Sequence, residues 1–181
     1  MKNALCLIAL LCVGGCANFG RVLNQNMTDV PGDKGIILFS TESDRTALRY
    51  ALALSVIDAE RHKEVPLNIF VDASFLPSDF EELHGNVRSL QLNAGRYYVT
   101  PRSGNPYACL RYRPQFEFTV RAGEIVYIGS FRRVGNSVEY SPGANRERDI
   151  KFFLERNPAL SQTEIRLETA SMSRDTKGEC D

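Results

Sequence analysis

The sequence predicts a mainly β protein, an antiparallel two-sheet β-sandwich with one C-terminal helix at about residues 146–157. From residue 36 onward, short apolar or alternating runs are separated by turn residues, which is typical of all-β domains. There are nine such runs, more than one sheet comfortably holds, and this favours two packed sheets. One segment near the C-terminus has helical periodicity instead.

The predicted strands are short and rich in β-branched and aromatic residues. They are Ile36–Phe39, Leu48–Ile57, Leu67–Val71, Val87–Leu92, Tyr97–Thr100, Phe116–Val120, Ile125–Phe131, Val138–Tyr140 and Glu164–Leu167. The run Ala47–Ala59 alternates like a strand, although its alanine and leucine content also suits a helix, and we predict a strand. Residues 125–128 are apolar on both faces and should be central, whereas residues 163–168 should have one wet face.

Three turn segments separate neighbouring strands and offer Gly or Asn where a positive φ is needed: Asn93-Ala94-Gly95, Arg121-Ala122-Gly123-Glu124 and Gly135-Asn136. They predict three successive hairpins and therefore an antiparallel meander.

The predicted helix has both end signals. Asn145 is placed to cap it, acidic residues follow in its first turn, and Pro158 stops it after Asn157. Its apolar stripe is Ile150, Phe153 and Leu154. We expect this helix to cover one end of the sandwich.

The N-terminus predicts export. Lys2 precedes an apolar run from Ala4 to Val13, which is the outline of a signal peptide and is too short to span a bilayer. The ending Val13-Gly14-Gly15-Cys16 resembles the lipobox of bacterial lipoproteins. That resemblance implies a diacylglycerol on the Cys16 thiol and cleavage before Cys16, and Ala17 after it implies the outer membrane. The alternative is ordinary cleavage near Gly15 that releases the protein.

These signals divide the chain into a signal peptide (residues 1–15), a flexible tether (16–34) and a periplasmic β-sandwich domain (35–181). Two further cysteines then lie in an oxidising compartment, and we predict a disulfide between Cys109 and Cys180. The alternative is a buried thiol at Cys109 and a free thiol at Cys180.

Charge and motifs exclude several classes of function. The 22 basic and 22 acidic side chains cancel, so nothing favours a nucleic-acid surface. Neither His62 nor His84 lies in a recognisable catalytic motif, and no nucleotide-binding or zinc-binding spacing occurs. The acidic residues Asp72, Asp79, Glu81 and Glu82 read as a solvated loop rather than a calcium site. We therefore predict no catalytic residue, no metal and no cofactor.

One candidate ligand patch can be assembled from basic and aromatic residues. It comprises Arg111, Arg113, Tyr127 and Arg132, which would bind an anion or a sugar if the strands brought them together. Charged residues alternating on the wet face of a sheet explain the same pattern.

The segment Gly95-Arg96-Tyr97-Tyr98 and the run Phe116–Phe131, followed by the helix and a last strand, resemble a group of small bacterial lipoproteins of unknown function. The resemblance covers roughly residues 90–168 and implies a transthyretin-like or immunoglobulin-like β-sandwich, with no catalytic residues. We expect a lipid-anchored, non-enzymatic binding or assembly accessory with an envelope protein as partner. The alternatives are a binding module for glycan, peptidoglycan or an anion, and a hydrolase with an unrecognised site.

Overall fold

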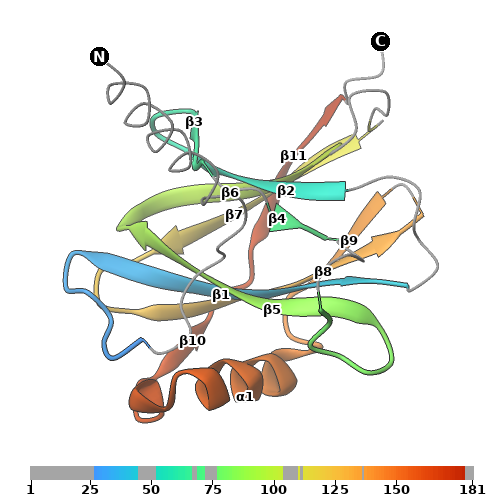
Figure 1. Ribbon diagram of the computed structural model, residues 1–181. Coiled ribbons are helices and arrows are strands. Elements are labelled where there is room, and N and C mark those ends of the chain that lie inside the picture. The colour runs from blue at the N-terminus through green and yellow to red at the C-terminus, as the bar shows by residue number, and fades with distance from the viewer. Residues whose placement is uncertain are drawn as a thin grey trace, which may run out of the picture.

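The computed structural model describes residues 27–44, 52–66, 69–71, 77–103, 110, 112–135 and 137–177, with only the backbone described at 112 and 173–177. Within these ranges the chain forms two packed β-sheets and one α-helix (Figure 1). The predicted β-sandwich with a single helix is therefore confirmed.

Sheet A lies beside the helix and is built around two strands that are buried on both faces. Its strands, in spatial order, are β10 (Ile165–Leu167), β8 (Ile125–Val134), β1 (Lys34–Ser43) and β5 (His84–Asn93), with β9 (Ser137–Ser141) paired to the far end of β8. The prediction that residues 125–128 are central is confirmed, since β8 is paired along both edges. Sheet A is mixed rather than purely antiparallel, because β8 runs parallel to both β1 and β10.

Sheet B is antiparallel throughout its described pairs. Its strands are β11 (Ser171–Lys177), β7 (Tyr112–Val120), β6 (Gly95–Ser103) and β2 (Leu52–Asp58), and β2 also pairs with the short strands β3 (Lys63–Glu64) and β4 (Ile69–Phe70). The ambiguous run is a strand over residues 52–58, and residues 47–51 lie outside the described residues. The polar strands β3 and β11 were not predicted, because neither has an apolar alternation.

Two of the three predicted hairpins are wrong. β5 pairs with β1 in sheet A, whereas β6, which begins two residues after β5 ends, pairs with β2 and β7 in sheet B. Likewise β7 belongs to sheet B and β8 to sheet A. The segments 93–95 and 121–124 are corners at which the chain crosses between sheets. Only the Gly135-Asn136 segment joins paired strands, β8 and β9.

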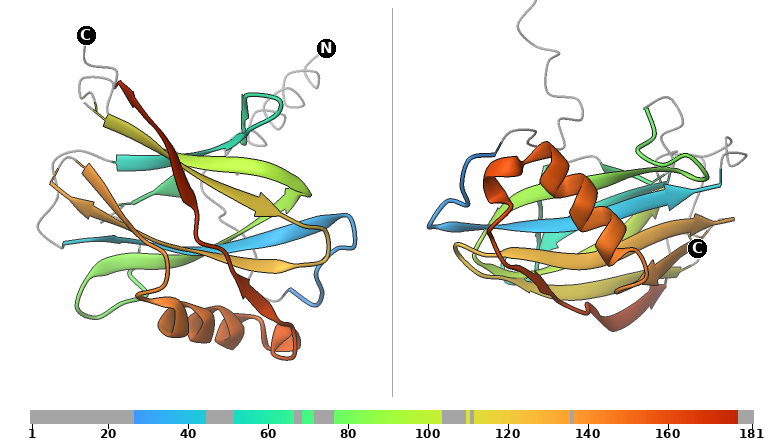
Figure 2. Two further views of the ribbon diagram at one scale, coloured as in Figure 1. Left: turned by 180° about the vertical axis from the view of Figure 1, so that it is seen from behind. Right: turned by 90° about the horizontal axis from the view of Figure 1, so that it is seen from below.

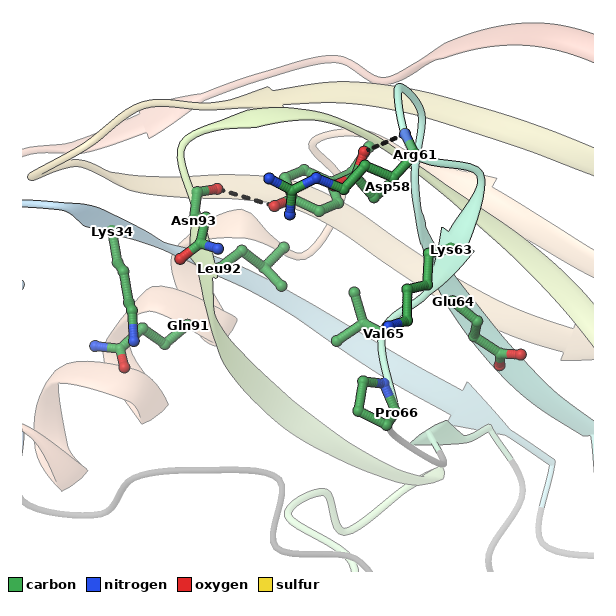
Figure 3. A pocket seen from close by; sticks show the side chains of 11 residues that line it. Lys34, Asp58, Arg61, Lys63, Glu64, Val65, Pro66, Gln91, Leu92 and Asn93 are labelled. Atoms are coloured by element: carbon green, nitrogen blue, oxygen red, sulfur yellow. Dashed lines mark hydrogen bonds and ion pairs between the residues drawn. The ribbon is translucent and has the colours of Figure 1, made fainter.

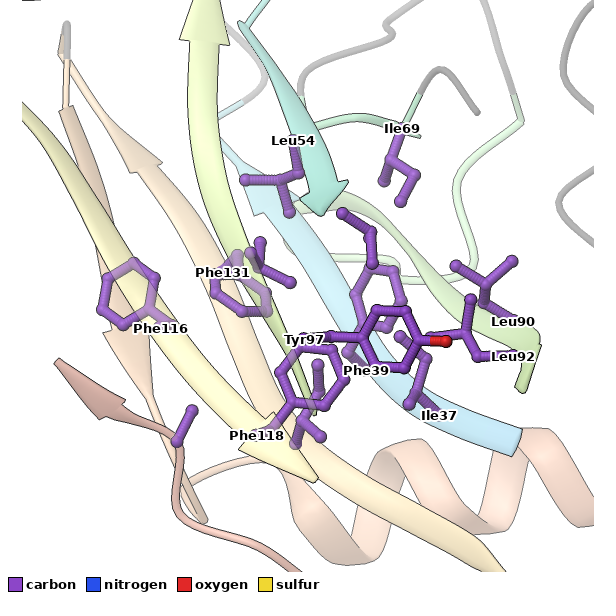
Figure 4. Close-up of a cluster of buried hydrophobic side chains, with 14 of the residues drawn as sticks. Ile37, Phe39, Leu54, Ile69, Leu90, Leu92, Tyr97, Phe116, Phe118 and Phe131 are labelled. Carbon is purple, nitrogen blue, oxygen red and sulfur yellow. The ribbon is translucent and has the colours of Figure 1, made fainter. Parts of the chain in front are cut away.

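Two apolar clusters hold these layers together. The larger one fills the space between the sheets, and Figure 4 shows its aromatic rings, among them Phe39, Phe116 and Phe131. Phe131 packs edge-on against both other rings, with ring centroids 6.0 Å from Phe39 and 5.6 Å from Phe116. The second cluster lies on the outer face of sheet A, where Ile36 and Tyr127 meet Phe153 of the helix.

The helix α1 (Arg146–Arg156) covers the outer face of sheet A rather than one end of the sandwich, which corrects our expectation (Figure 2). The reason is the second cluster, because β1 and β8 present apolar residues on this face as well as to the inner core. The helix ends one residue before Asn157, as Pro158 predicts, and the 3-10 helix η1 (Pro158–Leu160) follows. Asn145 is the N-cap, but its side chain makes no capping bond.

Part of the predicted tether packs on the domain. Met27 and Val30 contact the second cluster, and the backbone N–H of Met27 donates to Oδ1 of Asn157 at 2.9 Å. The signal peptide, Cys16, and the tether as far as residue 26 lie outside the described residues. Among the helices of the described chain, none has the length and apolar character needed to cross a membrane.

Candidate ligand-binding groove

A groove of about 240 Å³ opens at the side of the sandwich where β5 of sheet A faces β3 and the residues after it in sheet B. Figure 3 shows the end of β5 on one side of the groove and the segment Lys63–Pro66 on the other. The lining residues are Lys34, Asp58, Arg61, Lys63, Glu64, Val65, Pro66, Gln91, Leu92, Asn93 and Tyr97.

The floor of the groove is apolar. Leu92 and Tyr97 each have an exposed fraction of 5% and belong to the core between the sheets, and Val65 packs against that core. The Tyr97 hydroxyl donates to the Asn93 carbonyl at 3.1 Å, which ties β6 to the end of β5. Burial raises the pKa of Tyr97, and the nearby negative charge of Asp58 adds to this, so the hydroxyl remains a hydrogen-bond donor.

Both acidic side chains of the groove accept hydrogen bonds within the protein, each through one carboxylate oxygen. Asp58 accepts the backbone N–H groups of Glu60 at 3.0 Å and Arg61 at 2.9 Å, and the bond from Arg61 contributes most to lowering the Asp58 pKa. Glu64 accepts the Ser55 hydroxyl at 2.6 Å and lies 3.8 Å from the Arg102 guanidinium.

The basic side chains are less engaged. Arg61 approaches Asp58 only at 3.9 Å, and 74% of its side chain is exposed. Lys34 and Lys63 form no ion pair with any described residue. Three basic side chains line the groove against two acidic ones, and the two lysines have no ion-pair partner among the described residues. The groove therefore has positive charge available for a ligand beside an apolar floor.

The predicted ligand patch is not assembled as one surface. Tyr127 is fully buried in the second cluster, and Arg111 lies outside the described residues. Arg113 stands on β7 of sheet B and donates to the Pro101 carbonyl at 3.3 Å, whereas Arg132 stands on β8 of sheet A and pairs with Asp44 at 2.9 Å. Where they are described, these side chains serve contacts within the domain.

A second polar cluster is enclosed beneath α1. The Tyr127 hydroxyl donates to Oδ2 of Asp149 at 2.8 Å, and Asp149 and Glu42 have exposed fractions of only 0% and 3%. Arg148 pairs with both carboxylates and lies over the Phe80 ring, 3.7 Å from its centroid. Asn145 also donates to Glu42 at 2.9 Å. The cluster joins α1 to β1 and β8, so we assign it to docking of the helix.

The predicted acidic loop serves the structure as well. Asp79 accepts two bonds from Arg156, at 2.5 and 3.0 Å, and one from the backbone N–H of Val87 at 2.8 Å. Burial works to raise the Asp79 pKa, but the bonds from Arg156 and Val87 outweigh it and the pKa is lowered. Asp72 lies outside the described residues, and the described part of the chain holds no group of three metal-ligating side chains.

The groove and the buried cluster were both missed at the level of sequence. Lys34, Lys63 and Gln91 come from three separate strands with unremarkable composition, so only the folded chain brings them together. Glu42 lies three residues after the apolar run Ile36–Phe39, in the polar last part of β1, so the sequence carried no signal of its burial. Cys109 and Cys180 lie outside the described residues, and their predicted disulfide stays a prediction.

The chain matches no protein-family model and no curated protein sequence. Among solved structures, it is similar to a crystal structure described as a "Putative cell adhesion protein" from Parabacteroides distasonis ATCC 8503, with 11% sequence identity and a TM-score of 0.35. The match covers 60% of this chain and 37% of that one, so it spans little more than a third of the similar protein.

Proposed function

We propose that the chain is a lipoprotein, anchored through Cys16 to the outer membrane and facing the periplasm, whose β-sandwich is a non-enzymatic binding module for an anionic component of the envelope. The observation that carries the binding role is the pair Lys34 and Lys63, without ion-pair partners among the described residues, beside the apolar floor of the groove.

Position at a membrane supports such a role physically. A diacylglycerol on Cys16 would confine the domain to one surface, which raises its effective concentration near components of the same membrane. A groove of this size can then serve at modest affinity. A protein segment with acidic side chains and an acidic glycan share the chemistry that the two lysines would recognise.

The binding role is tested by measuring how an acidic probe binds to the full-length chain in detergent. A fluorescein-labelled, capped hexapeptide of alternating glutamate and valine serves as the protein-like probe, and oligogalacturonate as the glycan-like competitor. We expect a K34Q/K63Q double variant to weaken probe binding by roughly tenfold or more, with the loss diminishing at high salt. Lys151→Gln, which changes an exposed lysine of α1, is the matched control.

The anchor is tested separately. Cys16→Ala should abolish metabolic acyl labelling and release the protein from its membrane fraction. Unchanged acylation in this variant would contradict the lipoprotein assignment, and equal probe binding by K34Q/K63Q and the unaltered chain would contradict the binding role.

A further inference from the structure

β5 is an edge strand of sheet A, and one half of its outer edge is already covered. The N–H of Gly85 donates to the Ser78 hydroxyl at 3.0 Å, and the N–H of Val87 donates to Oδ2 of Asp79 at 2.8 Å. The Gly85 carbonyl accepts the N–H of Asp79 at 2.8 Å. Residues 78 and 79 thus occupy the first half of this edge, which protects it from pairing with another chain.

The second half of the same edge borders the groove. Ile36 faces Gln91 across the β1–β5 pair, but the Ile36 N–H donates to the Glu124 carbonyl at 2.9 Å, on the side away from β5. The Ile36–Gln91 pair is therefore a non-hydrogen-bonded pair of the antiparallel ladder. The backbone N–H and C=O of Gln91 consequently point away from β1, and no described residue bonds to them there.

The two faces of this edge differ in chemistry. In the β1–β5 pair, Lys34 is opposite Asn93 and Ile36 is opposite Gln91. Lys34 and Ile36 are two residues apart on β1, so Lys34 lies on the same face of sheet A as Gln91. Leu92 lies on the opposite face, in the core between the sheets, close to Val65 in the groove. A strand added here would meet a lysine on one face and an apolar floor on the other.

Resting on the proposed function, we infer that the anionic partner is a protein, and that it binds as an extended segment of alternating acidic and apolar residues that adds to the outer edge of β5 at Gln91. Backbone bonds to Gln91 supply the pairing, Lys34 takes the acidic side chains on one face of the added strand, and Leu92 and Val65 take the apolar ones on the other face. The added strand cannot extend along the first half of the edge, because residues 78 and 79 already occupy it.

The test compares probes and variants that differ only in backbone bonding. The glutamate–valine hexapeptide is measured against the same peptide carrying N-methyl groups on alternate residues, which keeps its charge but removes the donors of one edge. In the protein, Gln91→Pro removes the outward N–H, and proline is tolerated at such edge positions. Gln91→Ala keeps the N–H and is the matched control.

We expect N-methylation and Gln91→Pro each to weaken binding by roughly tenfold, and Gln91→Ala to change it little. Hydrogen–deuterium exchange of the segment 89–93 should slow when the unmodified peptide is bound. The N-methyl comparison does not depend on how well the proline variant folds, and circular dichroism checks that variant.

The possible failures are distinguishable. If the peptide binds through the lysines but is insensitive to N-methylation and to Gln91→Pro, the added strand is refuted and the anionic groove stands. If oligogalacturonate binds and the peptide does not, the partner is a glycan, and the inference fails while the proposed function holds. If neither probe binds at about 1 mM, both are refuted.

Discussion

At the scale of single residues, a buried carboxylate must be paired with a charge or a hydrogen-bond donor for the domain to be stable. Asp149 is fully enclosed, and it is acceptable there because Arg148 pairs with it and the Tyr127 hydroxyl donates to it at 2.8 Å. Burial raises the pKa of Tyr127 above its ordinary value, and the adjacent charge of Asp149 raises it further, so the hydroxyl keeps its proton.

Tyr127→Phe should lower the free energy of unfolding by about 2 kcal/mol, because it removes a hydrogen bond to a buried carboxylate without changing the ring. Urea unfolding followed by circular dichroism measures this, since the chain has no tryptophan. Tyr98→Phe is the control, because the structure gives its hydroxyl no bond to a described residue. An unchanged unfolding midpoint for Tyr127→Phe would show that the bond contributes nothing.

The lowered pKa of Asp79 should make the stability of the domain depend on pH. Its pKa is lowered in the folded state from an unfolded value of 3.8, so its charged form stabilises the fold. This contribution is fully present well above the unfolded value of 3.8 and is lost as the pH falls through the lower folded pKa. The difference in unfolding free energy between the unaltered chain and Asp79→Asn should therefore shrink as the pH falls below the unfolded value of 3.8 toward the lower folded pKa.

Urea unfolding at a series of pH values measures this difference. Asp33→Asn, at an exposed turn, is the comparison variant. If the difference in unfolding free energy for Asp79→Asn stayed the same at every acidic pH tested, the assigned role of the Arg156–Asp79 pair would be contradicted.

At the scale of elements, β8 shows how a local irregularity is built into a central strand. Its pairing with β1 slips between Tyr127 and Gly129, and Gly129 has a φ of 108°. A Cβ at this position would lie 2.7 Å from the Ser141 carbonyl oxygen, so both the backbone conformation and the space require glycine.

Gly129→Ala should destabilise the domain by roughly 1–3 kcal/mol or more, because strain and a backbone clash act together. Gly143→Ala is the matched control, since a Cβ there meets nothing within 4 Å and the φ is not positive. Thermal unfolding of the two variants makes the comparison. Equal melting temperatures would refute the requirement for glycine in β8.

The elements also show where reasoning from sequence succeeds. β8 and α1 have strong local signals, an apolar run on both faces and an apolar stripe closed by Pro158, and both were placed within a few residues. β3 and β11 were missed because their residues are polar. Such strands form through backbone pairing with β2 and β7, and this pairing leaves no side-chain periodicity in the sequence from which it could be predicted.

At the scale of the whole molecule, the chain passes repeatedly from one sheet of the sandwich to the other. β10 pairs in sheet A and β11 in sheet B, so the C-terminal segment joins the layers as well (Figure 2). A disulfide between Cys109 and Cys180 would add a covalent link between the chain before β7 and the tail after β11, two strands that are paired with each other.

If this disulfide forms, the intact mass of the unreduced protein should lie about 2 Da below the mass of the dithiol form, and neither cysteine should react with a thiol reagent before reduction. Reduction should lower stability by roughly 4 kcal/mol in the chain-entropy model, because the closed loop holds about seventy residues. Labelling of both thiols in the unreduced protein would rule the bond out.

The sequence by itself determined the elements with a local physical cause: the strands with an alternating or continuous apolar pattern, the helix with its proline stop, and the turn positions that glycine or asparagine permits. The tertiary structure alone decided which strands pair, that β8 lies parallel to β1, and that the segments 93–95 and 121–124 are corners rather than hairpins. It also decided that Lys34, Lys63 and Gln91 share one groove. Periodicity and turn chemistry act over a few residues, whereas pairing depends on which apolar faces can be buried together across the whole chain.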